Sequence, residues 1–255
     1  MTQFRKYEQT CLLLSDAAKD LRQDPSTRKY VTWNATAGHD AIGIQPSGKI
    51  TTISKDRFAL HFEKNLYRID NIIISPDKPK AYACIWVTFQ IFEGLDDQFI
   101  VSNCNGNSPT AFRGISASSE EIHIWGAEND SSVSIKCTTT KRWITVFVSW
   151  SNDGAGTYSI NDDEIRGTFK CAAATPFMQT ELFIGGKEAT VQASHRLITN
   201  QLNGAIASLE IYTQSSHIKE SMIPLELQSL VTKAKLIKDD DDDDGSPAHK
   251  TLKCM

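Results

Sequence analysis

Apolar and polar residues alternate with a period of two along most of the chain between Tyr30 and Tyr212. This period is typical of β-strands, in which successive side chains point to opposite faces. Glycine, asparagine, aspartate and serine separate the alternating runs, as expected for turns. The pattern predicts these strands: Lys49–Ile53, Phe58–Phe62, Tyr82–Ile91, Gln98–Ser102, Glu121–Trp125, Val133–Cys137, Trp143–Trp150, Thr157–Ile160, Glu181–Ile184 and Ala205–Tyr212. We therefore expect an all-β fold with two packed antiparallel sheets.

The longest of these strands, Tyr82–Ile91, has one wholly apolar face that suits the space between two sheets. That face consists of Ala83, Ile85, Val87, Phe89 and Ile91. The opposite face consists of Tyr82, Cys84, Trp86, Thr88 and Gln90. Aromatic rings among polar groups are what a sugar- or peptide-binding surface needs, so Tyr82 and Trp86 are candidate ligand-binding residues. The alternative is that another part of the chain covers this face.

The two ends of the chain have a different pattern. Cys11, Leu14, Ala18 and Leu21 recur at helical spacing, which predicts a helical lead-in over residues 1–27. The sandwich domain then takes residues 28–215, and an amphipathic helix with Pro224 in its first turn takes 216–238. Residues 239–255 begin with six consecutive aspartates and predict a disordered acidic tail.

Composition and charge narrow the classes of function. The chain is 40% hydrophobic, which is enough for a packed core. Without the last 17 residues, acidic and basic side chains are equal in number and no basic cluster stands out, so we expect no nucleic-acid partner. No run reaches the roughly 18 apolar residues of a membrane span. The apolar run Cys11–Leu14 is too short for a signal peptide, so a cytoplasmic or non-classically exported protein is expected.

The order of motifs in the C-terminal half resembles a known family. The strand Arg142–Trp150 precedes the turn Asn152–Gly154 and a hairpin through Thr157–Asp162, and Leu182–Gly186 and Leu202–Tyr212 follow. This order is similar to that of concanavalin A-like and laminin G-like jelly rolls over about residues 50–212. The family often has Asn-Gly in the hairpin, where this chain has Asn161-Asp162-Asp163, but Asn and Asp tolerate the same left-handed turn. The resemblance implies a jelly-roll sandwich with short terminal helices, and that fold alone names no function.

The residue types of the predicted strand Glu121–Trp125 distinguish an enzyme from a binding protein. Its alternation places Glu121, His123 and Trp125 on one face. Related jelly-roll glycoside hydrolases place several acids on such a strand, and a retaining mechanism needs two carboxyls about 5–5.5 Å apart. Only one of the three residues here is a carboxylate, so we expect no enzymatic activity. The same three side chains suit a sugar ligand, or they are ordinary surface groups.

The resemblance also suggests calcium, which many relatives hold at the rim of the sandwich. The chain offers Asn152 and Asp153 in one hairpin and Asp162 and Asp163 in the next. Calcium takes six to eight oxygen ligands, more than one short turn supplies, and solvated turns are the alternative. We therefore expect no required cofactor, with calcium as the one metal to test.

The sequence as a whole favours a non-catalytic recognition module that binds a glycan or a protein surface. Its candidate ligand-binding residues are Tyr82, Trp86, Glu121, His123 and Trp125. The alternative is a structural protein that self-assembles into oligomers or a matrix, because terminal amphipathic helices beside a neutral body can pair between copies. A polysaccharide hydrolase is the third hypothesis.

Overall fold

The computed structural model describes thirteen stretches of the chain, all of them within one compact unit, Met1–Lys219. These are residues 9–14, 20–36, 38–54, 57–72, 82–93, 96–103, 113–127, 132–140, 142–151, 154–161, 164–171, 180–191 and 195–214. Some strand residues, Tyr82 among them, are described for their backbone alone. The predicted C-terminal helix and acidic tail, residues 216–255, lie outside the described residues.

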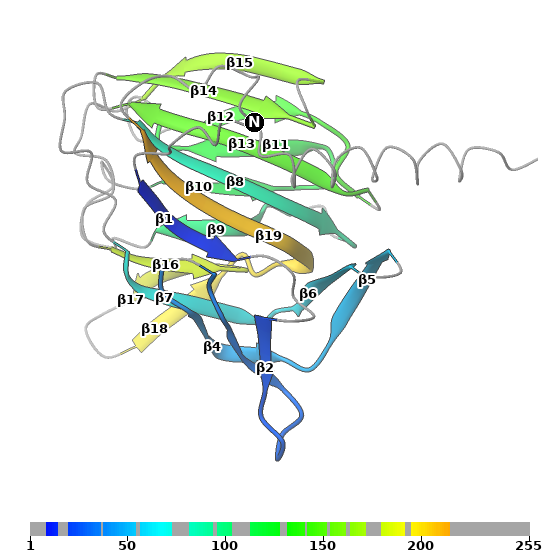
Figure 1. Ribbon diagram of the computed structural model, residues 1–255. Helices are drawn as coiled ribbons and strands as arrows, with labels where there is room; N and C mark the ends of the chain where they lie inside the picture. Colours follow the sequence, from blue (N-terminus) through cyan, green and yellow to red (C-terminus); the bar gives the residue numbers. More distant parts are fainter. Residues whose placement is uncertain are drawn as a thin grey trace, which may run out of the picture. The chain divides into compact units, whose positions relative to one another are not determined.

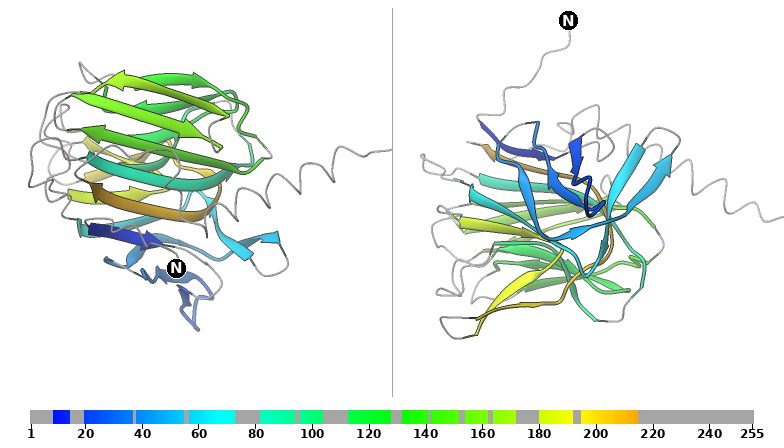
Figure 2. Two further views of the ribbon diagram at one scale, coloured as in Figure 1. Left: turned by 45° about the horizontal axis from the view of Figure 1, so that its top comes forward. Right: turned by 90° about the horizontal axis from the view of Figure 1, so that it is seen from below.

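The described chain forms two large antiparallel sheets that pack face to face as a sandwich (Figures 1 and 2). Sheet A has the strand order β15 (Ile165–Lys170), β14 (Ala155–Ile160), β13 (Ile144–Ser151), β8 (Tyr82–Ile91), β19 (Asn203–Gln214), β6 (Arg57–Glu63) and β5 (Ile50–Ser54), and β1 (Gln9–Leu14) also pairs with β19. Sheet B has the order β12 (Ser132–Lys136), β11 (Glu121–Trp125), β10 (Gly114–Ala117), β9 (Gln98–Asn103), β16 (Thr180–Ile184), β7 (Leu66–Ile72), β4 (Ala41–Ser47), β3 (Tyr30–Trp33) and β2 (Leu21–Gln23). A separate hairpin consists of β17 (Lys187–Val191) and β18 (His195–Thr199). All ten predicted strands are present, which confirms the all-β, two-sheet fold.

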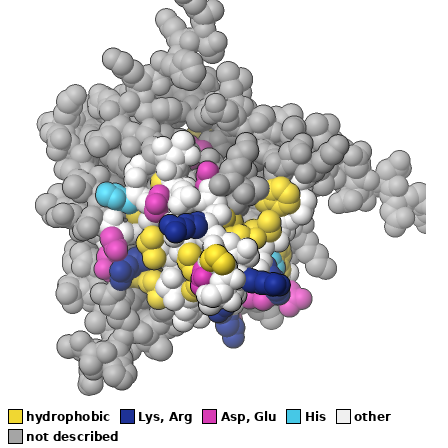
Figure 3. Space-filling model, turned by 60° about the horizontal axis from the view of Figure 1, so that its bottom comes forward, with side chains coloured by type: hydrophobic (Ala, Val, Ile, Leu, Met, Phe, Trp, Pro, Cys, Tyr) yellow, Lys and Arg dark blue, Asp and Glu magenta, His cyan; other side chains and the backbone are white. Residues whose placement is uncertain are grey.

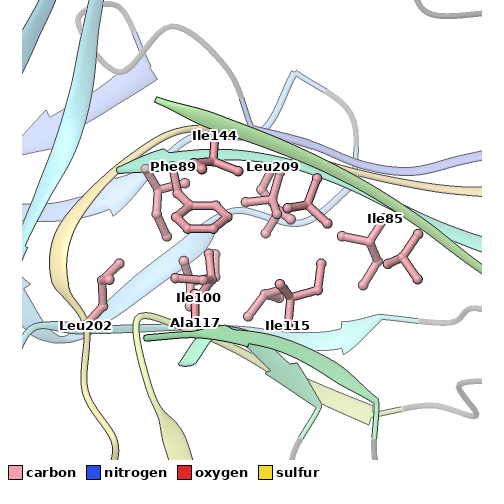
Figure 4. Packing of buried hydrophobic residues seen from close by; sticks show 14 of the residues in the cluster. Ile85, Phe89, Ile100, Ile115, Ala117, Ile144, Leu202 and Leu209 are labelled. Atoms are coloured by element: carbon pink, nitrogen blue, oxygen red, sulfur yellow. The ribbon is translucent and has the colours of Figure 1, made fainter. Parts of the chain in front are cut away.

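The core lies between the inner faces of the two sheets. In β8 the predicted inner residues Ile85, Val87, Phe89 and Ile91 are at most 1% exposed. Figure 4 shows Phe89, Ile144 and Leu209 of sheet A facing Ile100, Ile115 and Ala117 of sheet B. Burial of these apolar side chains on both sheets is what stabilises the sandwich.

The predicted N-terminal helix is wrong, because Gln9–Leu14 is a strand. Strand β19 pairs with β6 only through Asn203–Ile206, which leaves its C-terminal half without a neighbour on that edge. Strand β1 fills this place, with Leu14 opposite Leu209, and Leu14 is fully buried. Backbone hydrogen bonds to an otherwise open strand edge outweigh the helical spacing of four apolar residues.

The turn between β14 and β15 has the geometry that the sequence predicts. Asn161 has a φ of 50°, the left-handed conformation that asparagine tolerates better than most residues. Its side-chain Oδ1 accepts a hydrogen bond from the Thr145 backbone N–H at 3.0 Å, and its Nδ2 donates to Glu164 Oε2 at 3.0 Å. The amide of Asn161 therefore holds the hairpin against β13.

The cysteines whose side chains are described lie in the core. Cys84, Cys137 and Cys171 are free thiols and all three are buried. Burial raises the pKa of the Cys137 thiol, which disfavours the reactive thiolate.

Tyr67 is fully buried and joins three strands of sheet B. Its hydroxyl donates to the Tyr30 carbonyl at 2.5 Å and accepts from the Ser47 N–H at 3.1 Å. Burial raises the pKa of Tyr67 from 10.0 to about 12, because the phenolate would lose its solvation.

This shift predicts a loss of stability in alkali. A raised pKa in the folded state stabilises the protein fully below pH 10, and this contribution is lost between about pH 10 and 12, where only the unfolded chain ionises. We expect Tyr67 to account for about 2 kcal/mol of the loss in unfolding free energy across this window. Urea titrations at each pH give the unfolding free energy of wild type and of Tyr67→Phe. The slope of this free energy against pH is then compared between the two proteins. Equal slopes would contradict this role of Tyr67.

Candidate functional site

Strand β11 presents Glu121, His123 and Trp125 on the outer face of sheet B. All three are partly exposed, whereas the intervening Ile122 and Ile124 are fully buried in the core. Strand β10 lies beside β11 with Ser116 opposite His123, and β9 lies beyond it with Phe99 opposite Ser116. The shared face predicted from the alternation is therefore present, and its neighbours come from β9 and β10.

A chain of hydrogen bonds joins Trp125 to a carboxylate. The indole Nε1–H donates to Ser116 Oγ at 2.7 Å, and the Ser116 hydroxyl donates to Asp97 Oδ2 at 2.7 Å. Ser116 is fully buried, so its hydroxyl has a single orientation that serves both partners. The Ser116 hydroxyl therefore links the ring of Trp125 to the carboxylate of Asp97 and holds both in fixed positions.

His123 lies between two carboxylates without a direct hydrogen bond to either. Its Nε2 is 3.6 Å from Glu121 Oε2 and 3.9 Å from Asp97 Oδ1. Its Nδ1 is 2.8 Å from Ser134 Oγ, and the tautomer in which Ser134 donates to Nδ1 directs the Nε2–H toward both carboxylates. Asp97 Oδ1 is a buried atom with no hydrogen-bond partner in the described chain. Two atoms this close leave no room for an oxygen between them, so an oxygen that bridges His123 and Glu121 lies beside the line that joins the two atoms.

An aromatic pair and a lysine complete the site. The rings of Phe99 and Trp125 lie 5.7 Å apart, and Lys187 Nζ lies 5.4 Å from the Phe99 centroid and 5.7 Å from that of Trp125. Lys187 begins β17, directly after Gly186, whose carbonyl accepts a hydrogen bond from Ser102 Oγ of β9 at 2.9 Å. The start of this hairpin is thus fixed against the outer face of sheet B. We call the set Asp97, Phe99, Ser116, Glu121, His123, Trp125 and Lys187 the Trp125 site.

Sequence reasoning found three members of the Trp125 site and missed the other four. Glu121, His123 and Trp125 lie on one strand, where alternation alone assigns them a common face. The side chains of Asp97, Ser116 and Lys187 come from other segments, and the pairing register of β9, β10 and β11 brings the first two to His123. No local pattern in the sequence marks that register.

The expectation of an exposed Trp86 is wrong. Its side chain is 5% exposed, and its ring packs against Phe147 of β13 at 4.9 Å between centroids. Its cross-strand neighbour Glu210 is 5% exposed as well, so the outer face of sheet A is covered at this point. The side chain of Tyr82 lies outside the described residues.

The predicted calcium ligands cannot be placed. Asn152, Asp153, Asp162 and Asp163 all lie outside the described residues. Among the residues that the structure does describe, no group of three His, Cys, Asp or Glu side chains is arranged to hold a metal ion. The calcium prediction therefore stays a prediction.

A second histidine cluster lies on the outer face of sheet A and has related chemistry. His61 Nδ1 is 2.9 Å from Thr51 Oγ1, its Nε2 is 3.3 Å from Glu63 Oε1, and its ring lies 4.9 Å from Phe92. Lys49 Nζ lies 2.7 Å from the same Glu63 oxygen and holds the pKa of that carboxyl below its usual range. An ion pair therefore already neutralises Glu63, whereas Asp97 Oδ1 of the Trp125 site has no hydrogen-bond partner among the described atoms.

Sequence comparisons give this chain no relatives. No protein-family model matches it, and no curated protein is similar to it in sequence. Within the described ranges, none of the helical structure is long and apolar enough to cross a membrane.

Comparison of structures finds the binding domains of botulinum neurotoxins. The binding domain of botulinum neurotoxin DC in complex with SialylT has a TM-score of 0.55 and 13% sequence identity over 90% of this chain. The same domain in complex with rat synaptotagmin II gives a TM-score of 0.54 at 13% identity over 89% of this chain. Botulinum neurotoxin type C, whose cell entry is described as dependent upon interaction with two ganglioside molecules, gives a TM-score of 0.53 at 14% identity over 89% of this chain. The match takes in 52% of each of these chains, so this chain spans about half their length, and the similarity concerns the fold.

Proposed function

We propose that the chain is a non-catalytic binding module and that its Trp125 site recognises a carbohydrate. The observation that carries this proposal is the partly exposed Trp125 held next to Asp97, Glu121 and His123 on the outer face of sheet B. An aromatic ring stacks on the apolar face of a pyranose, while charged and polar groups bind its hydroxyls.

The spacing of the polar atoms suits a sugar hydroxyl. A sugar hydroxyl beside His123 accepts from its Nε2–H and donates to Glu121 Oε2, which lies 3.6 Å from that nitrogen and is partly exposed. A ligand hydroxyl that replaces an ordered water and makes the same hydrogen bonds retains their contribution to the binding free energy.

The structural neighbours support a binding role and leave the ligand open. Their descriptions include gangliosides and SialylT as well as synaptotagmin II, and the matched region is about half of each chain. The choice of a carbohydrate therefore rests on the chemistry of the Trp125 site. Membership of the concanavalin A-like group is part of the same proposal, supported by the two-sheet sandwich and by the order of motifs.

Replacement of Trp125 by alanine tests the proposal. A glycan array with the full chain first identifies a binding sugar, and calorimetry then compares the variants. We expect Trp125→Ala to weaken binding about tenfold, which corresponds to the loss of one stacking contact of about 1.4 kcal/mol. Trp143→Ala is the matched control, because Trp143 is also partly buried but packs near Ala205 of sheet A. Unchanged affinity in Trp125→Ala, or an equal loss of affinity in Trp143→Ala, would contradict the proposal.

The non-catalytic part of the proposal has its own test. His123 has a carboxylate on either side, and such a set can also transfer protons during hydrolysis. Turnover of the bound glycan that disappears in Glu121→Gln would make this protein an enzyme. We expect no turnover by the wild type.

Self-assembly is a second candidate, and the β5 edge of sheet A favours it. Ile50–Ser54 contains no charged residue, proline or glycine, whereas the edge strands β12, β2 and β15 carry exposed charges at Lys136, Arg22 and Arg166. The large hydrophobic residues that stand exposed in the described chain, Ile42, Ile44 and Ile50, lie on β4 and β5. Figure 3, seen from the lower side of Figure 1 where β4 lies, shows hydrophobic side chains among lysine and arginine side chains.

Light scattering over a range of concentrations distinguishes this candidate. Pairing of β5 with a second copy predicts a mass above the 28.4 kDa of one chain, and Thr52→Lys should return it to that value by placing a charge on the edge. Thr168→Lys on β15 is the control, because that edge already carries Arg166 and Lys170. A constant mass of one chain at all concentrations would rule out assembly through β5.

A further inference from the structure

The exposure of the outer face of sheet B changes from strand to strand across the Trp125 site. We infer that the site continues over the edge strand β12 and binds the last two residues of a glycan chain, with the terminal residue on Trp125 and the next one on β12. This inference rests on the proposed carbohydrate function and adds to it the length of the ligand and the side on which the glycan leaves the site.

The register between β11 and β12 places one polar residue beside each β11 member of the site. The β12 partners of Trp125, His123 and Glu121 are Ser132, Ser134 and Lys136, respectively. These three side chains lie on the outer face, because the intervening Ile135 is 5% exposed and Val133 packs against the core. Adjacent strands lie about 4.8 Å apart, which is close to the length of one sugar residue. A glycan that crosses from β11 to β12 therefore places successive residues on successive strands.

The site is closed on the side of β9 and β10. Ser116 of β10 and Ser102 of β9 are fully buried, and Phe99 is 3% exposed. The Lys187 ammonium lies over the ring of Phe99 as well as that of Trp125. A sugar ring stacked on Trp125 therefore meets covered strands on this side, which makes it the end of the glycan chain.

The site is open on the side of β12. Ser134 and Lys136 are exposed there, and Ser132 is partly exposed. Serine side chains are short, so a sugar ring can approach the strand closely. The Ser132 hydroxyl both donates and accepts, and the Lys136 ammonium has three donors, which suits the hydroxyls of a second sugar residue. Because β12 is the edge strand of the described sheet, a third residue would pass beyond it.

Ligands of increasing length test the inference. Calorimetry with the full chain measures affinity for the free mono-, di- and trisaccharides of glucose, galactose, mannose and N-acetylglucosamine. In the series that binds, we expect the disaccharide to bind about tenfold more tightly than the monosaccharide, an effect of one or two hydrogen bonds. The trisaccharide should bind within about twofold of the disaccharide, because its third residue lies beyond β12.

Two substitutions on β12 locate the second sugar residue. Ser132→Ile places a branched side chain where this residue would lie, so the tenfold gain should disappear while the monosaccharide affinity stays unchanged. Lys136→Met removes the ammonium alone and should reduce the gain about threefold. Thr168→Ile is the matched control, because Thr168 is an exposed hydroxyl residue on the edge strand β15 of sheet A. Isoleucine is common in strands, and thermal unfolding of each variant checks that the sandwich is intact.

The possible outcomes separate the inference from the carbohydrate function. Equal affinities for mono- and disaccharide would overturn the inference and leave the carbohydrate function standing. A gain that persists in both Ser132→Ile and Lys136→Met would overturn it too, since the second residue would then lie elsewhere. A further tenfold gain with the trisaccharide would contradict a site of two residues. Failure of the wild type to bind any of these sugars would end both proposals.

Discussion

Replacement of Trp150 by alanine is expected to lower the free energy of unfolding by about 4 kcal/mol. Trp150 is fully buried in β13, and its indole Nε1–H donates to the backbone carbonyl of Trp125 at 3.2 Å. The substitution removes one of the two fully buried tryptophans of the described core, leaves a cavity between the sheets and takes the donor from that carbonyl. Urea unfolding followed by circular dichroism measures the shift in midpoint at an unchanged slope.

Two further variants separate the causes of this loss. Trp150→Phe retains much of the volume without the N–H, so we expect it to cost about half as much. Trp143→Ala removes the same side chain from a partly buried position near Ala205 and Ala207, and about 1–2 kcal/mol is expected there. Equal losses for Trp150→Ala and Trp143→Ala would show that burial between the sheets is not the cause.

Alternation along the sequence predicts the parts of this fold that depend on one strand at a time. In Tyr82–Ile91 every second residue from Ile85 to Ile91 is large and apolar, and these residues form the inner face of β8. In Glu121–Trp125 the same rule predicts both the buried isoleucines and the face of the candidate site. A period of two fixes which residues share a face, because the backbone leaves no other arrangement in a strand.

Alternation within a strand does not predict whether other parts of the chain cover the outer face of the sheet. Trp86 and Trp125 both stand opposite the inner residues of their strands, yet Trp86 is 5% exposed and packs on Phe147, while Trp125 is partly exposed. The difference comes from residues far away in the sequence. For the same reason the role of Gln9–Leu14 was missed, since only the free edge of β19 determines that this segment is a strand.

The candidate site depends on register even more strongly. Ser116 lies between Trp125 and Asp97 because β10 pairs with β11 so that Ser116 is opposite His123. A shift of that pairing by one residue would place Ser116 on the inner face and separate Trp125 from Asp97. The pairing of β10 with β9 also shifts in register between Ile115 and Ser116, which contributes to this placement. No residue type in the sequence predicts that shift.

Gly204→Ala is expected to cost about 3 kcal/mol of unfolding free energy, because strand β19 has no room for a side chain at this position. A Cβ there would lie 2.2 Å from the Gln90 carbonyl oxygen, a backbone atom of the neighbouring strand β8 that cannot rotate away. Gly48→Ala is the matched control, since the nearest atom to its Cβ would be the Arg28 carbonyl oxygen at 4.0 Å, and neither glycine has a positive φ. We expect Gly48→Ala to change stability by at most about 0.5 kcal/mol. Any cost at Gly204 therefore reflects the close approach of two strands and not a glycine conformation. Similar urea midpoints for the two variants would contradict this account of the β8–β19 contact.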